Sequence, residues 1–112
     1  MEEKRRSIRI KKPVTVQYCR NPDVDEKKWD MTFVRDISQT GMCITLDTSF
    51  APGKILDFRL KFPTAAQKWI DLKGRVVDSK MNGYITRIEF VDLKEEDKKL
   101  IGEFIAFYYK GV

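Results

Sequence analysis

The sequence lacks several residues and motifs on which enzymes depend. Its 112 residues include no histidine and only two cysteines, Cys19 and Cys43. The commonest general base is therefore absent, and two isolated cysteines form neither a CxxC redox pair nor a zinc cluster. No GxxxxGK[ST] or GxGxxG loop is present to hold nucleotide phosphates. These absences predict a protein that is not an enzyme and has no resident metal or cofactor.

The chain also lacks a long apolar run. No stretch approaches the roughly 20 apolar residues of a membrane-spanning helix, and no signal peptide is recognisable. We therefore expect a cytoplasmic protein without membrane insertion, in which both cysteines stay reduced and buried. The composition is 42% hydrophobic and 35% charged, which is typical of one folded domain.

Positive charge is concentrated at the N-terminus, in the stretch KRRSIRIKK (4–12). Residues 1–12 hold six cations and two anions, whereas the remainder holds sixteen cations and fifteen anions. A DNA-binding protein would usually spread its cations over a face of the fold. We expect residues 1–12 to be a flexible basic arm that ends at Pro13. Such an arm could serve as a solubilising tail, a nucleic-acid or membrane-surface anchor, or a clamp for one anion.

After the arm, apolar and polar residues alternate with a period of two, which predicts β-strands. The expected strands are 14–18, 31–37, 42–47, 55–62, 68–79 and 84–91. Gly41 is able to take a positive φ in the turn 38–41, and Gly74 indicates a bulge or bend. Asn-Gly at 82–83 predicts a hairpin. In the last strand Tyr84, Thr86, Ile88 and Phe90 are expected to face the core, with Arg87 pointing away from it.

The final segment changes to helical periodicity. Asp92 is the expected N-cap, with Glu95 at capping-box spacing, and Gly111 is a natural stop. The expected apolar stripe is Leu100, Ile101, Phe104, Ile105 and Tyr108. The sequence therefore predicts an all-β domain over 13–112 with one C-terminal helix at about 92–110. Six antiparallel strands indicate a small barrel or sandwich, with the helix at one end or over an open face.

Two short motifs are candidates for a binding site. Arg5 and Arg9 form an Arg-x-x-x-Arg pair, and guanidinium groups can grip phosphate or the O6/N7 edge of guanine with two parallel hydrogen bonds. Asp36, Ser38 and Gly41 form an Asp-x-Ser-x-x-Gly at a strand end. Alone, the first motif is weak and the second is equally explained by turn chemistry, because Asp and Ser often bond nearby backbone groups.

Together, RRSIRI (5–10) and DISQTGMCI (36–44) resemble the PilZ family over nearly the whole chain. The resemblance implies a six-stranded antiparallel barrel with a C-terminal helix and a receptor for cyclic di-GMP. It also implies roles for the motif residues. Arg5 and Arg9 would grip guanines and phosphates, Asp36 and Ser38 would bond the ligand, and Gly41 would let the turn pass close to it.

The resemblance leaves other positions open. Lys4 occupies a position linked in the family to the binding of one ligand or a stacked pair. Arg6 could stack on a base, contact phosphate or stay solvated. Arg87 could contact the ligand or form a surface ion pair. The family often has a small residue near Thr86 or Arg87, which this chain lacks, and Trp29 and Trp69 are expected to pack in the core or at its rim.

The function implied is a stand-alone bacterial cyclic di-GMP receptor whose ligand orders the arm over the barrel. The surface so created would be read by an effector protein in trans, in motility, polysaccharide export or adhesion. One alternative is a PilZ-like protein adaptor that does not bind the nucleotide. Another is an RNA-binding barrel, which the lack of an outward aromatic stripe disfavours, so no nucleic-acid polymer is expected as a partner.

Overall fold

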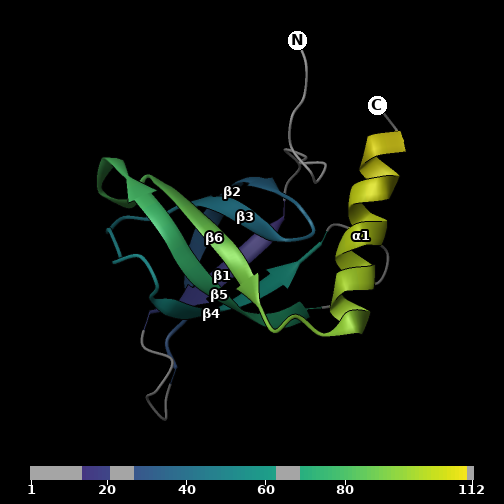
Figure 1. The fold of residues 1–112 in the computed structure, drawn as a ribbon, viewed down its shortest axis with the longest axis horizontal. Coiled ribbons are helices and arrows are strands. Elements are labelled where there is room, and N and C mark those ends of the chain that lie inside the picture. Colours follow the sequence, from purple (N-terminus) through teal and green to yellow (C-terminus); the bar gives the residue numbers. More distant parts are fainter. Residues whose placement is uncertain (1–13, 21–26, 63–68, 111–112) are drawn as a thin grey trace.

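The computed structural model describes residues 14–20, 27–62 and 69–110, the last four of these by backbone alone. This part of the chain forms six β-strands, a short 3₁₀ turn and one helix (Figure 1). The elements are β1 (Thr15–Cys19), β2 (Asp30–Ile37), β3 (Gly41–Thr45), β4 (Ile55–Lys61), β5 (Trp69–Lys80), η1 (Met81–Gly83), β6 (Ile85–Val91) and α1 (Glu95–Lys110). The observed strands agree with the expected ones to within two residues at each end.

The strands close into an antiparallel barrel in the order β1-β2-β3-β6-β5-β4. The prediction of a six-stranded barrel with a C-terminal helix is therefore confirmed, and the sandwich alternative is excluded. Closure pairs every strand on both sides and leaves no free edge. Period-two alternation fills the interior, as in β4, where Leu56, Phe58 and Leu60 are fully buried while Arg59 and Lys61 lie on the outer side.

Helix α1 stands beside one end of the barrel (Figure 1) and packs against it through one apolar stripe. Ile101, Phe104 and Ile105 are buried, and the ring centroid of Phe104 lies 4.3 Å from that of Phe62, just beyond β4. Leu100, expected on this stripe, is instead 37% exposed, and the side chain of Tyr108 lies outside the described residues. No helix in the described part of the chain is long and apolar enough to cross a lipid bilayer.

The predicted helix start was wrong. Asp92 has a φ of 49° and does not cap α1. The helix begins at Glu95, and the Lys94 carbonyl accepts the first hydrogen bonds, from the amides of Asp97 at 3.0 Å and Lys98 at 2.9 Å. Three acidic residues still occupy the first turn, where they interact favourably with the helix dipole.

Gly41 does not adopt the positive φ that a glycine allows, since the described glycines with positive φ are Gly53 and Gly83. One prediction at a turn failed. Tyr84 is 51% exposed instead of buried. Three successive left-handed residues, Met81, Asn82 and Gly83, form the hairpin tip, so β6 starts only at Ile85 and the alternation does not extend back to Tyr84. Cys19 and Cys43 are both buried thiols outside any disulfide, as expected.

Candidate ligand-binding face

The turn between β2 and β3 is closed by Ser38. This residue is fully buried, and its amide donates to the Gly41 carbonyl at 2.8 Å. Its hydroxyl accepts from the Thr40 amide and can donate to the Gly41 carbonyl, both at 3.3 Å. Ser38 thus does the turn chemistry that its motif allows, and its contact with a ligand stays a prediction.

Neighbouring elements hold this turn in place. The Thr40 carbonyl accepts from the Phe90 amide at 2.9 Å, at the end of β6. A Cβ at Gly102 of α1 would press on the end of the Gln39 side chain, and a Cβ at Gly41 would collide with the Ile88 carbonyl of β6. Gly41 therefore lets β3 and β6 approach closely. The expected role, letting the turn pass close to a ligand, remains a prediction.

A bulge in β2 places two consecutive residues on the outer side of the barrel. Val34 pairs with Ile44, but Asp36 pairs with Cys43, so Arg35 is an extra residue in the ladder. A bulge of this kind re-aims the side chains beside it. Arg35 is exposed and Asp36 is half-buried, while Ile37 returns to the core. The bulge thus sets a guanidinium directly beside the motif carboxylate.

Asp36 starts a row of side chains that crosses four strands. It pairs with Cys43, Cys43 with Arg87, and Arg87 with Asp78, across β2, β3, β6 and β5. A second bulge, at Val77, immediately precedes Asp78. Met42 and Ile44 belong to the core, so by alternation this row lies on the outer surface. The prediction that Arg87 points away from the core is confirmed.

The last two members of the row form an ion pair. Arg87 Nε lies 3.1 Å from both carboxylate oxygens of Asp78. The hydrogen bond from Arg87 lowers the pKa of Asp78 below its ordinary value, and the same bond raises the pKa of Arg87. The ion pair is the alternative that the sequence left open for Arg87. A ligand could still reach this guanidinium, which is 55% exposed.

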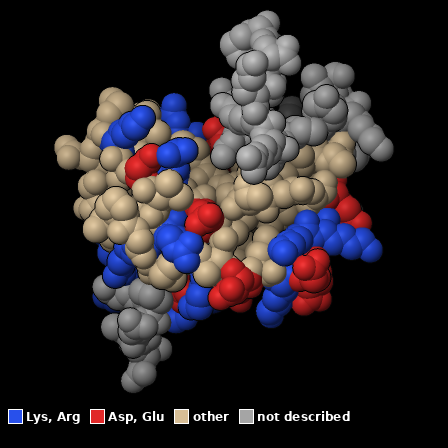
Figure 2. All heavy atoms as spheres, in the orientation of Figure 1, with Lys and Arg blue, Asp and Glu red and all other residues tan. Residues whose placement is uncertain are grey.

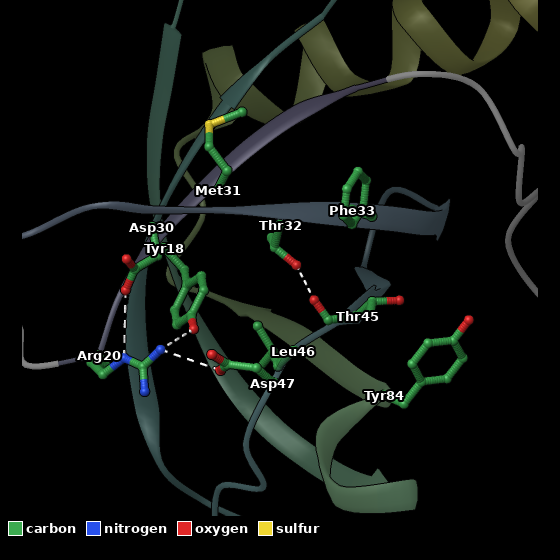
Figure 3. A pocket seen from close by; sticks show the side chains of 10 residues that line it. All are labelled: Tyr18, Arg20, Asp30, Met31, Thr32, Phe33, Thr45, Leu46, Asp47 and Tyr84. Carbon is green, nitrogen blue, oxygen red and sulfur yellow. Dashed lines mark hydrogen bonds and ion pairs between the residues drawn. The ribbon is translucent and has the colours of Figure 1, made fainter.

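A cavity of about 440 Å³ adjoins this face (Figure 3). At one side, the Arg20 guanidinium donates to the Tyr18 hydroxyl at 2.6 Å and to Asp47 at 3.3 Å. Burial raises the pKa of Tyr18. At the other side stand Phe33 and Tyr84, which are 78% and 51% exposed.

The sequence reasoning missed this aromatic pair. The alternation in MTFVR could have indicated that Phe33 points outward. Thr32 is buried and Val34 is half-buried, so the residues between and after them, Phe33 and Arg35, lie on the outer side. Two outward aromatics that line one cavity also weaken the argument that was made against base stacking.

The tryptophans lie elsewhere. The Arg59 guanidinium is 4.2 Å from the centre of a Trp29 ring, and Lys61 Nζ is 5.5 Å from one of Trp69. Both contacts are within cation–π range, and Trp69 is 40% exposed. Both rings thus lie against outward-facing cations of β4, and neither belongs to the hydrophobic core, which was one of the two expected places. Charged side chains of both signs surround a broad uncharged area in the view of Figure 2.

The structure therefore places Asp36, Gly41 and Arg87 on the neighbouring strands β2, β3 and β6, with Ser38 buried in the turn between β2 and β3. Lys4, Arg5, Arg6 and Arg9 lie outside the described residues, so their roles stay predictions. Among the residues that the structure describes, no three His, Cys, Asp or Glu side chains gather in a way that could hold a metal ion.

Comparison with known proteins identifies both a family and structural neighbours. A sequence profile of the PilZ domain matches residues 3–107. The inhibitor of motility MotI/DgrA from Bacillus subtilis superposes with a TM-score of 0.76 at 18% identity, covering 98% of this chain and 53% of that chain. The chain thus spans about half the length of that protein.

Two further structures show the same fold. The PilZ domain of YcgR from Escherichia coli, solved with cyclic di-GMP, superposes with a TM-score of 0.66 at 12% identity, over 97% of this chain and 94% of that chain. A tetrameric PilZ domain protein from Xanthomonas campestris gives 0.57 at 15% identity, over 80% and 50%. No curated protein sequence matches.

Proposed function

The chain belongs to the PilZ domain family, and on this premise we propose that it is a bacterial cyclic di-GMP receptor. PilZ domains form a family of receptors for this second messenger. The observation that carries the proposal is the closed Ser38 turn, which holds Asp36 on the outer surface in one row with Arg87. The protein acts in the cytoplasm by binding and has no catalytic activity.

The chemistry of this face suits the ligand. Cyclic di-GMP is a dianion with two guanines, and each guanine offers amine donors on one edge and the O6/N7 acceptors on another. Asp36 accepts hydrogen bonds from guanine amines, and the guanidinium groups of Arg5 and Arg9 grip phosphates and O6/N7 edges. Lys4 and Arg6 add positive charge beside them. Each charge-assisted hydrogen bond contributes about 1.5–3 kcal/mol.

Binding also supplies the signal. The clustered cations of residues 4–12 repel one another until a dianion neutralises them, so the ligand orders this arm over the barrel. The ordered arm and barrel form a new surface, which a downstream effector protein recognises. Both PilZ motifs are intact in this chain, which argues against the alternative of an adaptor that does not bind the nucleotide.

The proposal is tested by calorimetric titration with cyclic di-GMP, with GTP and cyclic GMP as controls. We expect selective binding in the micromolar range, which corresponds to about −8 kcal/mol. Arg9→Ala should weaken it at least tenfold, since it removes charge-assisted bonds. As a control, Lys12→Ala also removes one positive charge, but at a position outside the motif, and should have little effect on affinity. Equal affinity for all three nucleotides, or no binding, would contradict the proposal.

A further inference from the structure

Arg35 and Tyr84 form an exposed stack beside the candidate face. The Arg35 guanidinium carbon lies 5.4 Å from the centre of the Tyr84 ring, within the range of a cation–π contact. No carboxylate among the described residues forms an ion pair with Arg35. By contrast, Arg75 binds Glu89 at 2.7 Å and Arg87 binds Asp78. The edge of the Arg35 guanidinium therefore keeps donors for another acceptor.

The backbone places this stack next to the ligand motif. The β2 bulge sets Arg35 directly beside Asp36 on the outer surface. Phe33 pairs with Thr45, which lies two residues along β3 from the partner of Asp36, or about 7 Å at the rise of a strand. Phe33, Thr45 and Tyr84 line the same side of the cavity (Figure 3). One nucleotide unit is long enough to reach from Asp36 to this side of the cavity.

We propose that Arg35 and Tyr84, with Phe33 beside them, form a purine-binding subsite that takes one guanine of cyclic di-GMP. The base stacks on the exposed aromatic surface, and Arg35 donates to its O6 and N7 atoms, a pairing that adenine cannot offer because its N6 is a donor. This inference rests on the proposed function. It also places a wall beside Thr86 and Arg87, where this chain lacks the small residue that the family often has.

A similar stack on another side of the barrel provides a matched control. Arg59 lies over Trp29 at 4.2 Å, but it also forms an ion pair with Asp71 at 3.6 Å. Its guanidinium is thus already engaged by a carboxylate. A general loss of positive charge or of a cation–π contact would affect Arg35 and Arg59 variants alike, whereas loss of a subsite affects only the first.

The test compares the wild type, Arg35→Ala, Arg35→Lys, Tyr84→Ala and Arg59→Ala in titrations with cyclic di-GMP and cyclic di-AMP. We expect Arg35→Ala and Tyr84→Ala to weaken cyclic di-GMP binding about tenfold. Arg35→Lys keeps the charge but loses the two parallel bonds, so it should lose much of the preference for guanine over adenine. Arg59→Ala should bind like the wild type.

Several outcomes would overturn the inference. If the wild type binds cyclic di-GMP and both Arg35→Ala and Tyr84→Ala bind within twofold of it, the subsite is wrong while the proposed function stands. If the wild type does not bind, both fail. If a single-stranded RNA of ten nucleotides binds as tightly as cyclic di-GMP, and Tyr84→Ala weakens both equally, the aromatic surface binds a nucleic-acid strand instead.

Discussion

Two sides of the barrel carry similar side chains in different arrangements. On the β4–β5 side, the Asp57 side chain is almost fully buried between Lys27 at 2.6 Å and Lys73 at 2.9 Å. The ladder between β4 and β5 is unbroken over seven residue pairs. On the β2–β3–β6 side, one bulge interrupts the β2–β3 ladder at Arg35, and another, at Val77 near the end of β5, interrupts the β5–β6 ladder.

Regular pairing explains the difference. An unbroken antiparallel ladder sets residues directly opposite one another, and on the β4–β5 side these are opposite charges: Asp57 faces Lys73, and Arg59 faces Asp71. Those charges neutralise each other and stabilise the fold. A bulge shifts the register, so that Arg35 lies beside Asp36 but opposite no residue of β3. The interrupted side therefore leaves the edge of the Arg35 guanidinium available for a ligand.

The largest effect is expected at Gly41, where β3 and β6 of the interrupted side approach closely. In Gly41→Val, the new side chain collides with the backbone carbonyl of Ile88, so we expect a loss of about 3 kcal/mol in the free energy of unfolding in urea. The control is Gly53→Ala, before β4. Gly53 has a φ of 93° with open space around it, so only conformational strain of about 1 kcal/mol applies. Equal losses would show that the β3–β6 approach is not the constraint.

A smaller effect is expected from Asp57→Asn, which removes the negative charge between Lys27 and Lys73 on the β4–β5 side. Burial alone would raise the pKa of Asp57, but hydrogen bonds from Lys27 and Lys73 outweigh it and hold the pKa below its ordinary value of 3.8. The charged form therefore stabilises the fold above that pH, and this contribution is lost as the pH falls through the lowered pKa. Because both lysines are partly exposed, we expect a loss of about 1 kcal/mol at pH 7.

The pH dependence and ligand affinity separate this account from general damage. The stability difference between the wild type and Asp57→Asn should shrink as the pH falls below about 4, and cyclic di-GMP affinity should not change. Asp71→Asn, at a carboxylate that is 77% exposed, serves as the control and should leave stability nearly unchanged. If Asp57→Asn lowered the affinity for cyclic di-GMP, the β4–β5 side would take part in binding.

The smallest effect is expected from Asp78→Asn. This change releases Arg87 from its ion pair and removes a negative charge near the dianion. If Arg87 contacts the ligand, cyclic di-GMP should bind about threefold more tightly, since a single exposed ion pair is weak. Titration of Arg87→Ala completes the comparison and should show weaker binding. If the affinity is unchanged in both variants, Arg87 does not contact the ligand and serves only in its surface ion pair with Asp78.

The sequence was a good guide to the elements and a poor guide to their register. Alternation in ILDFRLKF and the stripe Ile101–Ile105 report burial directly, because each pattern depends on neighbours along the chain. Bulges depend on two strands at once. Gly74 indicated one in β5, but the shift lies at Val77, and Gly74 instead makes room for Phe58 and Ile88 in the core.

The same limit applies to the candidate site. The motif Asp36–Gly41 could be located from residue types alone, and period two indicated that Arg87 points outward. Asp36 joins the outward row with Arg87 only because of the bulge in β2, which the sequence did not indicate. The stack of Arg35 on Tyr84 could not be predicted, because it requires the left-handed hairpin tip that exposes Tyr84. Asp92 failed as an N-cap for a similar reason, since its positive φ depends on how the chain leaves β6.

The most direct test of the central claim is an amide NMR titration of the full chain with cyclic di-GMP. The interrupted side should respond, with the largest shifts at Arg35, Asp36, Gly41 and Arg87, and resonances of residues 4–12 should change as the arm orders. Amides of Asp57 and Lys73 should stay in place. Shifts centred on the β4–β5 side, or none at saturating nucleotide, would contradict the account.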